Sequence, residues 1–232
     1  MNNLYIVSTP IGNLQDVTKR AIDVLGSVDY IICEDTRTTG SMLKKVLTNF
    51  DNKGKLISYY EQNELKRIPE ILSLLIQGKS VALVSDAGTP TISDPGFKLV
   101  REALKSGIKV VSVPGPSSVT SALTISGLPT DKFLFLGFLP KKSGNRLKIL
   151  NSLNDSLKLL NTTVIIFESP HSLITTLNDL KSVFGDINVT LCREITKIYE
   201  ETKKGNIKEL IDYYSQNNPK GEFVLLFNLK DY

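Results

Sequence analysis

The stretch VALVSDAGTPTISDPG, residues 81–96, decides the fold class of this 232-residue chain. Its first four residues are apolar, which is typical of a buried strand. The residues that follow are small and include Asp86 and Gly88, so a ligand can approach the backbone of this loop closely. At the end of the stretch, Asp94 and Pro95 fit the N-cap and the first position of a helix. We therefore predict a strand, a ligand-binding loop and a helix in direct succession.

Short apolar runs alternate with segments of helical period along the rest of the chain, and this pattern is typical of α/β architecture. We expect Asp16 to cap the first helix and Pro69 to lie near the first turn of a later one. Turn signals at 127–147 place a junction just before them, which predicts two α/β subdomains, 1–115 and 116–232. The predicted strands are 4–8, 30–34, 55–58, 81–85, 109–113, 133–138, 163–167, 188–193 and 223–228.

Composition limits the possible functions. The chain is 41% hydrophobic and 22% charged. It has no signal-peptide pattern and no apolar run near the roughly 18 residues that span a bilayer, so we expect a cytoplasmic protein. Cys33 and Cys192 belong to no CxxC pair, which favours two reduced core cysteines. Because His171 is the single histidine, we expect no metal site, and the net charge of +4 permits an RNA partner.

Three predicted strands end in loops of small residues and proline, at 4–13, 81–90 and 110–118. The carboxyl ends of strands line the ligand crevice of open α/β sheets, so three such loops together indicate one site, although each loop alone also fits an ordinary turn. No GxGxxG follows a strand, which argues against a Rossmann dinucleotide site. The GKS at 78–80 precedes a strand and lacks the first glycine of a P-loop.

Eight motifs occur in a fixed order along the chain, and together they are highly specific. They are STPIGNLQD, CEDTRTT, ALVSDAGTPTISDPG, VPGPSS, GFLP, FESPH, LCREITKIYEE and GEFVLLF. In these motifs, which extend over essentially all 232 residues, the chain closely resembles the ribosomal RNA small subunit methyltransferase I family. The resemblance implies a tetrapyrrole methylase-like fold, with two α/β subdomains and the cofactor cleft between them.

The same resemblance implies a reaction and its partners. A methyl group would pass from S-adenosyl-L-methionine to the ribose 2′-oxygen of one cytidine in the decoding region of 16S rRNA, in the 30S subunit, and the protein would be a homodimer. For Phe167 a buried core position is the alternative to a cofactor contact. By motif position, the implied cofactor-binding residues are Thr9, Pro10, Asp86, Ala87, Gly88, Ser117, Ser118 and Phe167.

Charged residues at two places are candidates for catalysis and RNA binding. Glu34, Asp35 and Arg37 gather at a strand end, and a ribose hydroxyl needs a proton acceptor before it attacks a methyl group. We predict that Asp35 accepts the proton and that Arg37 binds phosphate, with an ion pair inside a turn as the alternative. In the basic loop after GFLP, where solvated surface residues are the alternative, the predicted phosphate contacts are Lys141, Lys142 and Arg146.

Two other functions remain open. A tetrapyrrole (precorrin-type) methyltransferase shares the fold, although CEDTR, TPIGNL and the basic loop argue against it. A non-catalytic RNA-binding assembly factor on the same fold is suggested by departures from the family pattern. Tyr60 and Gln62 stand in a segment where relatives commonly carry histidine, and Ser172 replaces an arginine. His171 itself fits a local turn or a dimer contact better than a catalytic role.

Overall fold

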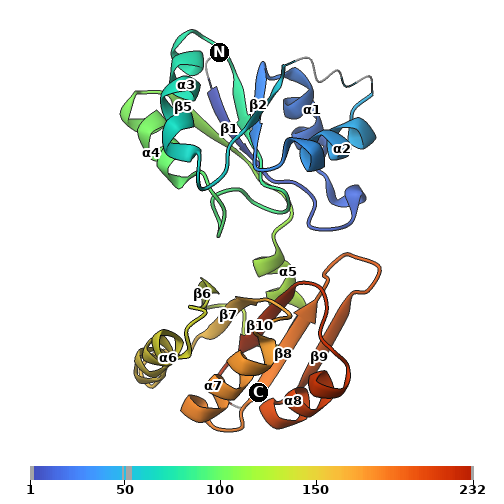
Figure 1. Ribbon diagram of the computed structural model, residues 1–232, viewed down its shortest axis with the longest axis vertical. Coiled ribbons are helices and arrows are strands. Elements are labelled where there is room, and N and C mark those ends of the chain that lie inside the picture. The colour runs from blue at the N-terminus through green and yellow to red at the C-terminus, as the bar shows by residue number, and fades with distance from the viewer. Residues whose placement is uncertain (1–2, 49, 51–53, 231–232) are drawn as a thin grey trace. The chain divides into compact units, whose positions relative to one another are not determined.

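The computed structural model describes residues 3–48, 50 and 54–230. It divides the chain into two compact units, Met1–Ser117 and Ser118–Tyr232, and each has its own sheet and its own helices (Figure 1).

Unit 1 is built on a five-stranded parallel sheet with the strand order β3-β2-β4-β1-β5. Its strands are β1 (Asn3–Val7), β2 (Tyr30–Cys33), β3 (Leu56–Ser58), β4 (Val81–Leu83) and β5 (Lys109–Val113). Its helices are η1 (Leu14–Asp16), α1 (Lys19–Ser27), α2 (Thr36–Val46), α3 (Glu64–Ile76) and α4 (Phe97–Lys105).

Helices cover both faces of this sheet, with α1 and α2 on one side and α3 and α4 on the other (Figure 1). Successive residues of a strand point to opposite faces, so an apolar run supplies both cores. In β4, Val81 and Leu83 join the core under α3 and α4, whereas Ala82 joins the core under α1 and α2. The apolar start of the 81–96 stretch is therefore a central strand buried on both faces.

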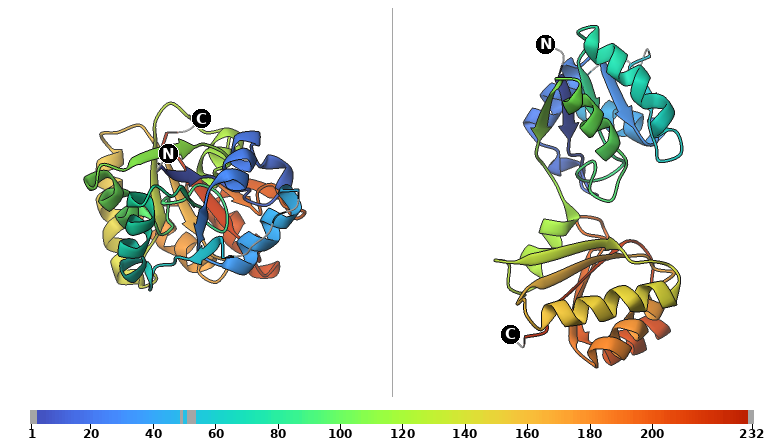
Figure 2. Two further views of the ribbon diagram at one scale, coloured as in Figure 1. Left: turned by 90° about the horizontal axis from the view of Figure 1, so that it is seen from above. Right: turned by 90° about the vertical axis from the view of Figure 1, so that its left-hand side faces the viewer.

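Unit 2 contains a mixed sheet with the strand order β6-β7-β10-β8-β9, in which only β6 and β7 run parallel. Helices α6, α7 and α8 pack on one face around a single core, and α5 lies on the other face (Figure 2). The strands are β6 (Phe133–Phe138), β7 (Thr163–Glu168), β8 (Asn188–Arg193), β9 (Glu201–Asn206) and β10 (Phe223–Phe227). The helices are α5 (Ser118–Ile125), α6 (Ser143–Leu157), α7 (Leu173–Phe184) and α8 (Ile207–Gln216).

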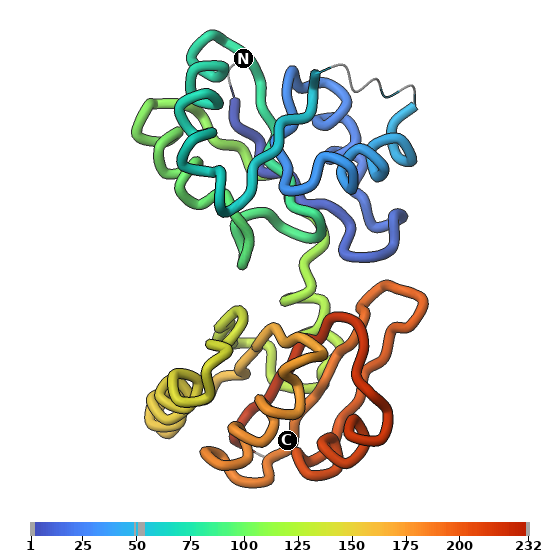
Figure 3. Tube along the Cα trace, viewed as in Figure 1, coloured from blue at the N-terminus to red at the C-terminus, as the bar shows by residue number. Residues whose placement is uncertain are grey.

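Strand β9, with the sequence ETKKGN, was missing from the sequence prediction. It is an edge strand that pairs antiparallel with β8, and the hairpin extends beyond its neighbours (Figure 3). Edge strands are commonly polar and charged, because these side chains discourage pairing with other molecules. A search for apolar alternation therefore misses such a strand.

Three predicted helix starts are wrong. Thr18, not Asp16, caps α1, because its side chain accepts a hydrogen bond from the Ala21 N–H at 3.1 Å. Pro69 lies inside α3, which begins five residues earlier, at Glu64. Helix α4 begins at Phe97 after Gly96, so neither Asp94 nor Pro95 has the predicted capping position.

Two further predictions concern the cysteines and membrane segments. Cys33 and Cys192 are free and buried, as predicted. Burial raises the pKa of the Cys33 thiol to about 11. Among the described residues, no helix is both long and apolar enough to cross a membrane.

Candidate functional site

Loops after β1 and β4 are joined at the carboxyl edge of the unit 1 sheet. The Thr9 N–H donates to the Gly88 carbonyl at 2.9 Å, and the Gly88 N–H donates to the Thr9 carbonyl at 3.1 Å. The Thr9 hydroxyl is fully buried and donates to the Ser85 carbonyl at 3.1 Å. Thr9 therefore holds the two predicted cofactor loops together, and the neighbouring Pro10 is buried beside it.

The loop after β5 joins the same cluster. The Thr89 hydroxyl donates to the Pro116 carbonyl at 3.1 Å and lies 3.0 Å from the Ser8 hydroxyl. A Cβ on Gly115 would lie only 3.0 Å from the Ser8 Cβ, so a side chain at this position would push the loops apart. The structure thus brings together the three loops that the sequence singled out.

Asp86 and Ala87 lie on the exposed side of this cluster, and Gly88 is buried behind them. Gly88 has a φ of 79°, which favours glycine, and a Cβ there would lie 3.3 Å from Ile11 Cγ2. Asp86 and Ala87 at the tip of the loop are exposed to solvent. The loop therefore presents one exposed carboxylate and the small Ala87 side chain, a combination suited to binding a polar ligand at close range.

The other predicted cofactor residues lie near or in unit 2. Ser117 ends unit 1 and Ser118 begins unit 2, and both are half-buried. Phe167 is half-buried on β7, where its ring meets Phe135 and Phe138 edge-on at centroid distances of 4.7 and 5.5 Å. Phe138 is 62% exposed, so this aromatic cluster is open to solvent and is not an interior core position.

The contacts of Asp35 argue against its predicted role as proton acceptor. Asp35 caps α2 through the Arg37 N–H at 2.8 Å, and its carboxylate also binds the Arg37 guanidinium at 2.7 Å. The Arg37 hydrogen bonds lower the pKa of Asp35 to about 2, which makes it a weak base. The turn ion pair is thus present, and the Arg37 side chain remains 90% exposed beyond it.

The neighbouring Glu34 has a raised pKa, in contrast to Asp35. It is half-buried at the end of β2. Burial raises its pKa to about 7, and the negative charges of Asp94 and Asp86 add to this effect. A carboxylate with a pKa near neutrality is half-protonated at physiological pH and can accept a proton from a bound hydroxyl.

Asp86 and Asp94 complete this carboxylate cluster. The Asp86 Oδ1 accepts a hydrogen bond from the Asp35 N–H at 3.3 Å. Partial burial and the Asp35 charge raise the pKa of Asp86, while this hydrogen bond lowers it. Burial raises the pKa of Asp94 to about 6, with a contribution from Asp86 and an opposing hydrogen bond from Ser85. Asp94 therefore belongs to this carboxylate cluster, and it does not cap α4, which begins at Phe97.

A strained loop places Asp94 in the cluster. Thr91 and Ser93 have φ values of 74° and 62°, which are uncommon for residues with a side chain. Gly96 has a φ of 131°, and a Cβ there would lie 2.5 Å from the Leu83 Cδ2. Such strain persists only where surrounding structure enforces it, and it is frequent at ligand sites.

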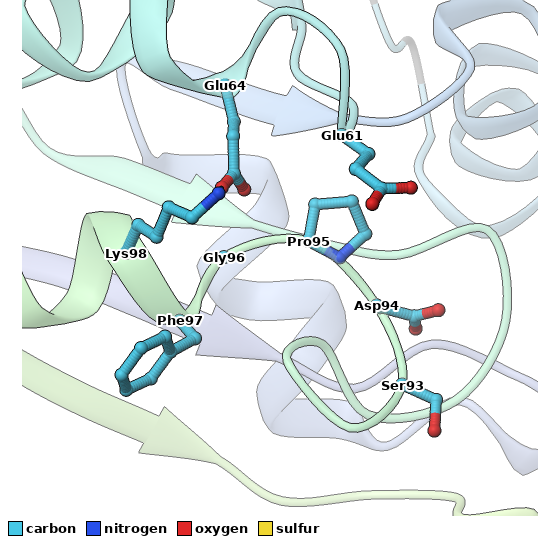
Figure 4. Close-up of a pocket in the computed structure, with 8 residues that line it drawn as sticks. All are labelled: Glu61, Glu64, Ser93, Asp94, Pro95, Gly96, Phe97 and Lys98. Atoms are coloured by element: carbon cyan, nitrogen blue, oxygen red, sulfur yellow. The ribbon is translucent and has the colours of Figure 1, made fainter. Parts of the chain in front are cut away.

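A pocket of about 270 Å³ lies beside this loop, also within unit 1. Asp94 lines it together with residues from the start of α3, so the pocket adjoins the carboxylate cluster (Figure 4). Lys98 Nζ meets the buried Glu64 carboxylate at 2.5 Å, whereas Phe97 points away from the acidic side chains. The lining residues are Glu61, Glu64, Ser93, Asp94, Pro95, Gly96, Phe97 and Lys98.

Two of the three predicted phosphate contacts in the basic loop of unit 2 are exposed, and the third is buried. Lys141 and Lys142 are exposed, as a phosphate contact requires. Arg146 is wrong as a direct phosphate contact, because its side chain is only 2% exposed and pairs with Asp179 at 2.6 Å. Sequence reasoning could not detect this pair, since Asp179 lies 33 residues further along, on α7.

Ser172, one of the departures from the family pattern, has a local structural role. Its hydroxyl donates to the buried Glu168 carboxylate at 2.5 Å and lies 2.8 Å from the Ser169 hydroxyl. His171 beside it is exposed. Tyr60 is 41% exposed, and Gln62 is exposed too, so both remain available to a partner.

Fold similarity defines the class of protein. Residues 3–211 match the family model of the Tetrapyrrole (Corrin/Porphyrin) Methylases. The structure resembles a cobalt precorrin-4 methyltransferase with a TM-score of 0.70 and 18% identity, covering 97% of this chain and 94% of that chain. It resembles the uroporphyrin-III-C-methyltransferase from Thermus thermophilus with a TM-score of 0.66 and 18% identity, covering 99% and 96%. The predicted α/β tetrapyrrole methylase fold is therefore confirmed.

Sequence relatives narrow this class. The chain is 46% identical over 231 residues to Ribosomal RNA small subunit methyltransferase I of Thermotoga maritima, covering 100% of both proteins. It is 47% identical over 227 residues to the protein of the same name from Rickettsia prowazekii, covering 98% of this chain and 78% of the relative. The chain thus belongs to the ribosomal RNA small subunit methyltransferase I family, which confirms the resemblance seen in its motifs.

Proposed function

We propose that the chain transfers a methyl group from S-adenosyl-L-methionine to the ribose 2′-oxygen of a cytidine in the decoding region of 16S rRNA. The substrate is the 30S subunit. The observation that carries this proposal is the 46% identity, over the full length of both chains, to a relative named Ribosomal RNA small subunit methyltransferase I. The site geometry of unit 1 agrees with it and suggests a role for each group.

The loop cluster of unit 1 fits the cofactor. Gly88 lets the loops after β1 and β4 pack closely, since a Cβ there would lie 3.3 Å from Ile11 Cγ2. The exposed Asp86 carboxylate accepts hydrogen bonds from amino or hydroxyl groups of a ligand. Phe167 belongs to unit 2, and it is proposed as an adenosine contact only from its motif position, with its ring in a solvent-open aromatic cluster. When bound, S-adenosylmethionine supplies the electrophilic methyl group. The remaining residues in this role are Thr9, Pro10, Ala87, Ser117 and Ser118.

Glu34 takes the proton of the ribose hydroxyl in this proposal. A hydroxyl is a poor nucleophile until its proton has an acceptor, and the best acceptor has a pKa near the working pH. The pKa of Glu34, about 7, meets this condition, whereas the pKa of Asp35, about 2, does not. Asp35 instead positions Arg37, whose exposed guanidinium binds an RNA phosphate.

Lys141 and Lys142 add sequence-independent attraction for the RNA backbone. The predicted homodimer remains a prediction, and light scattering measures it directly.

Methyl transfer from labelled cofactor tests the function. We expect the protein to label 30S subunits, and nucleoside mass spectrometry to identify the product as 2′-O-methylcytidine. Labelling of a precorrin and not of 30S would instead support a tetrapyrrole methyltransferase, which the fold neighbours make the natural second candidate. Tight 30S binding without transfer would indicate an assembly factor.

Replacement of Asp86 tests the cofactor loop. Asp86→Ala should weaken binding of S-adenosylmethionine about tenfold or more, since hydrogen bonds to a charged group contribute roughly 1.5–3 kcal/mol. Titration calorimetry measures this change, and Asp16→Ala, an exposed aspartate of the same unit, is the matched control. Wild-type affinity in Asp86→Ala would remove Asp86 from the cofactor site.

A further inference from the structure

Arg146 and Asp179 form a buried ion pair that joins two helices of unit 2. The Arg146 side chain, in the first turn of α6, is 2% exposed, and the Asp179 side chain on α7 is 15% exposed. Arg146 Nε donates to the Asp179 Oδ2 at 2.7 Å, and Nη2 lies 2.6 Å from the same oxygen. The Ser143 hydroxyl also donates to this carboxylate, at 3.0 and 3.1 Å to its two oxygens.

The same guanidinium holds the segment that links β6 to α6. Arg146 Nη1 donates to the Pro140 carbonyl at 3.1 Å and to the Lys141 carbonyl at 3.3 Å. The guanidinium is planar and rigid, so one group fixes the two carbonyls relative to α7. Lysine at position 146 could keep the charge but could not make all of these contacts at once.

The segment held in this way carries the exposed Lys141 and Lys142 side chains. Because the backbone at Pro140 and Lys141 is anchored inward, the lysine side chains extend from a fixed base into solvent. A long side chain that starts from an ordered backbone loses less conformational freedom when it binds a phosphate.

We propose that Arg146 and Asp179 are positioning residues that hold Lys141 and Lys142 in place for contact with the RNA backbone. This role rests on the proposed function, because RNA is the partner that the lysines contact. Arg146 thus contributes to RNA recognition from inside the protein, without touching a phosphate.

The test compares four variants with the wild type. The pair replacement Arg146→Met with Asp179→Leu removes both charges together, since a buried pair is often replaced by apolar residues without loss of folding. Arg146→Lys keeps the charge and is the second variant if the pair replacement does not fold. The double variant Lys141→Ala with Lys142→Ala removes the phosphate contacts themselves. Lys158→Ala, a 64% exposed lysine just after α6, is the matched control.

The first measurement is limited trypsin digestion, which does not depend on RNA. In the pair replacement and in Arg146→Lys, cleavage after Lys141 and Lys142 should become about tenfold faster, because the segment opens locally more often. Unchanged cleavage in a folded variant would overturn the positioning role.

The second measurement is methylation of 30S subunits at several salt concentrations. In the pair replacement and in Arg146→Lys, we expect the KM for 30S to rise about 5- to 20-fold, because ordering the two lysines costs more, while kcat and the KM for S-adenosylmethionine stay unchanged.

In the Lys141/Lys142 double variant, the slope of log affinity against log salt should fall by about 0.7 per lost contact. Faster trypsin cleavage with a wild-type KM for 30S would show that the order of this segment does not affect RNA binding, and would overturn the proposed role. If the wild type does not bind 30S at all, the proposed function fails, and the digestion still decides whether Arg146 orders the segment.

Discussion

Replacing Glu34 by glutamine should stabilise unit 1 at alkaline pH and stop methyl transfer. Burial and the charges of Asp94 and Asp86 raise the pKa of Glu34 from 4.5 to about 7. Below about pH 4.5 the carboxyl is protonated in both the folded and the unfolded chain, so it has no effect on stability. As the pH rises from 4.5 to about 7, the folded protein loses stability, and above pH 7 the full cost is present.

The size of this cost follows from the two pKa values. The difference between 4.5 and about 7 corresponds to an upper limit of about 3.4 kcal/mol, at 1.36 kcal/mol per pH unit. Glu34 is only half-buried, so solvent screening reduces the expected cost to about 1–2 kcal/mol. Glutamine has nearly the same shape and no charge, and it removes this cost.

Thermal unfolding at pH 5 and pH 8 measures the effect. At pH 8, Glu34→Gln should raise the midpoint of the transition that unfolds unit 1 by about 2–8 °C, and at pH 5 the gain should be much smaller. Glu102→Gln is the control of opposite sign, because Lys105 and Arg101 lower the pKa of Glu102 and its replacement should not stabilise at pH 8. An equal gain at both pH values, or a loss at pH 8, would show that the pKa of Glu34 is not raised in the folded protein.

Further substitutions test the other corrections to the sequence prediction. Thr18→Ala should reduce the free energy of unfolding by about 1 kcal/mol through loss of the α1 cap, whereas Asp16→Ala should change it little, as urea titration will show. Gly96→Ala should cost more than about 2 kcal/mol, because its Cβ would meet Leu83 at 2.5 Å and its φ is 131°, and Gly144→Ala, with open space around its Cβ, is the matched control. The rate of methyl transfer should rise with pH to a plateau above about 7 in the wild type, and a profile that is flat between pH 5 and 8 would exclude Glu34 as the proton acceptor.

The strands were largely predictable because apolar runs rich in β-branched and aromatic residues are bounded by turn residues. The bounds of β5, β6 and β8 agree with the prediction, β1 is shifted by one residue at both ends, and the other predicted strands differ by one or two residues at one end. Strand β9 was not predictable in this way, since its polar residues at a sheet edge have no apolar period. The predicted start of α1 was wrong because Asp16 and Thr18 are both residue types that commonly cap helices.

The candidate site was predictable as a set of loops but not as a set of charges. Small residues in SDAGTP and VPGPSS indicated where the backbone is open, and the structure brings these loops together. Glu34 and Asp35 are adjacent carboxylates, and only their neighbours in space distinguish a raised pKa from a lowered one. Asp94 fitted the pattern of a helix cap, although α4 begins three residues later. In the sequence, Gly96 is the one residue that indicates the strained turn before this helix.

The proposed function places a methyl group on a cytidine ribose of small subunit rRNA, with Glu34 as the proton acceptor. Its most direct test is mass spectrometry of 16S rRNA from a strain that lacks this protein, complemented with the wild type or with Glu34→Gln. We expect 2′-O-methylcytidine in the decoding region to disappear in the deletion strain, to return with the wild type and to stay absent with Glu34→Gln. Unchanged methylation in the deletion strain would contradict the proposed function, and full restoration by Glu34→Gln would contradict the role of Glu34.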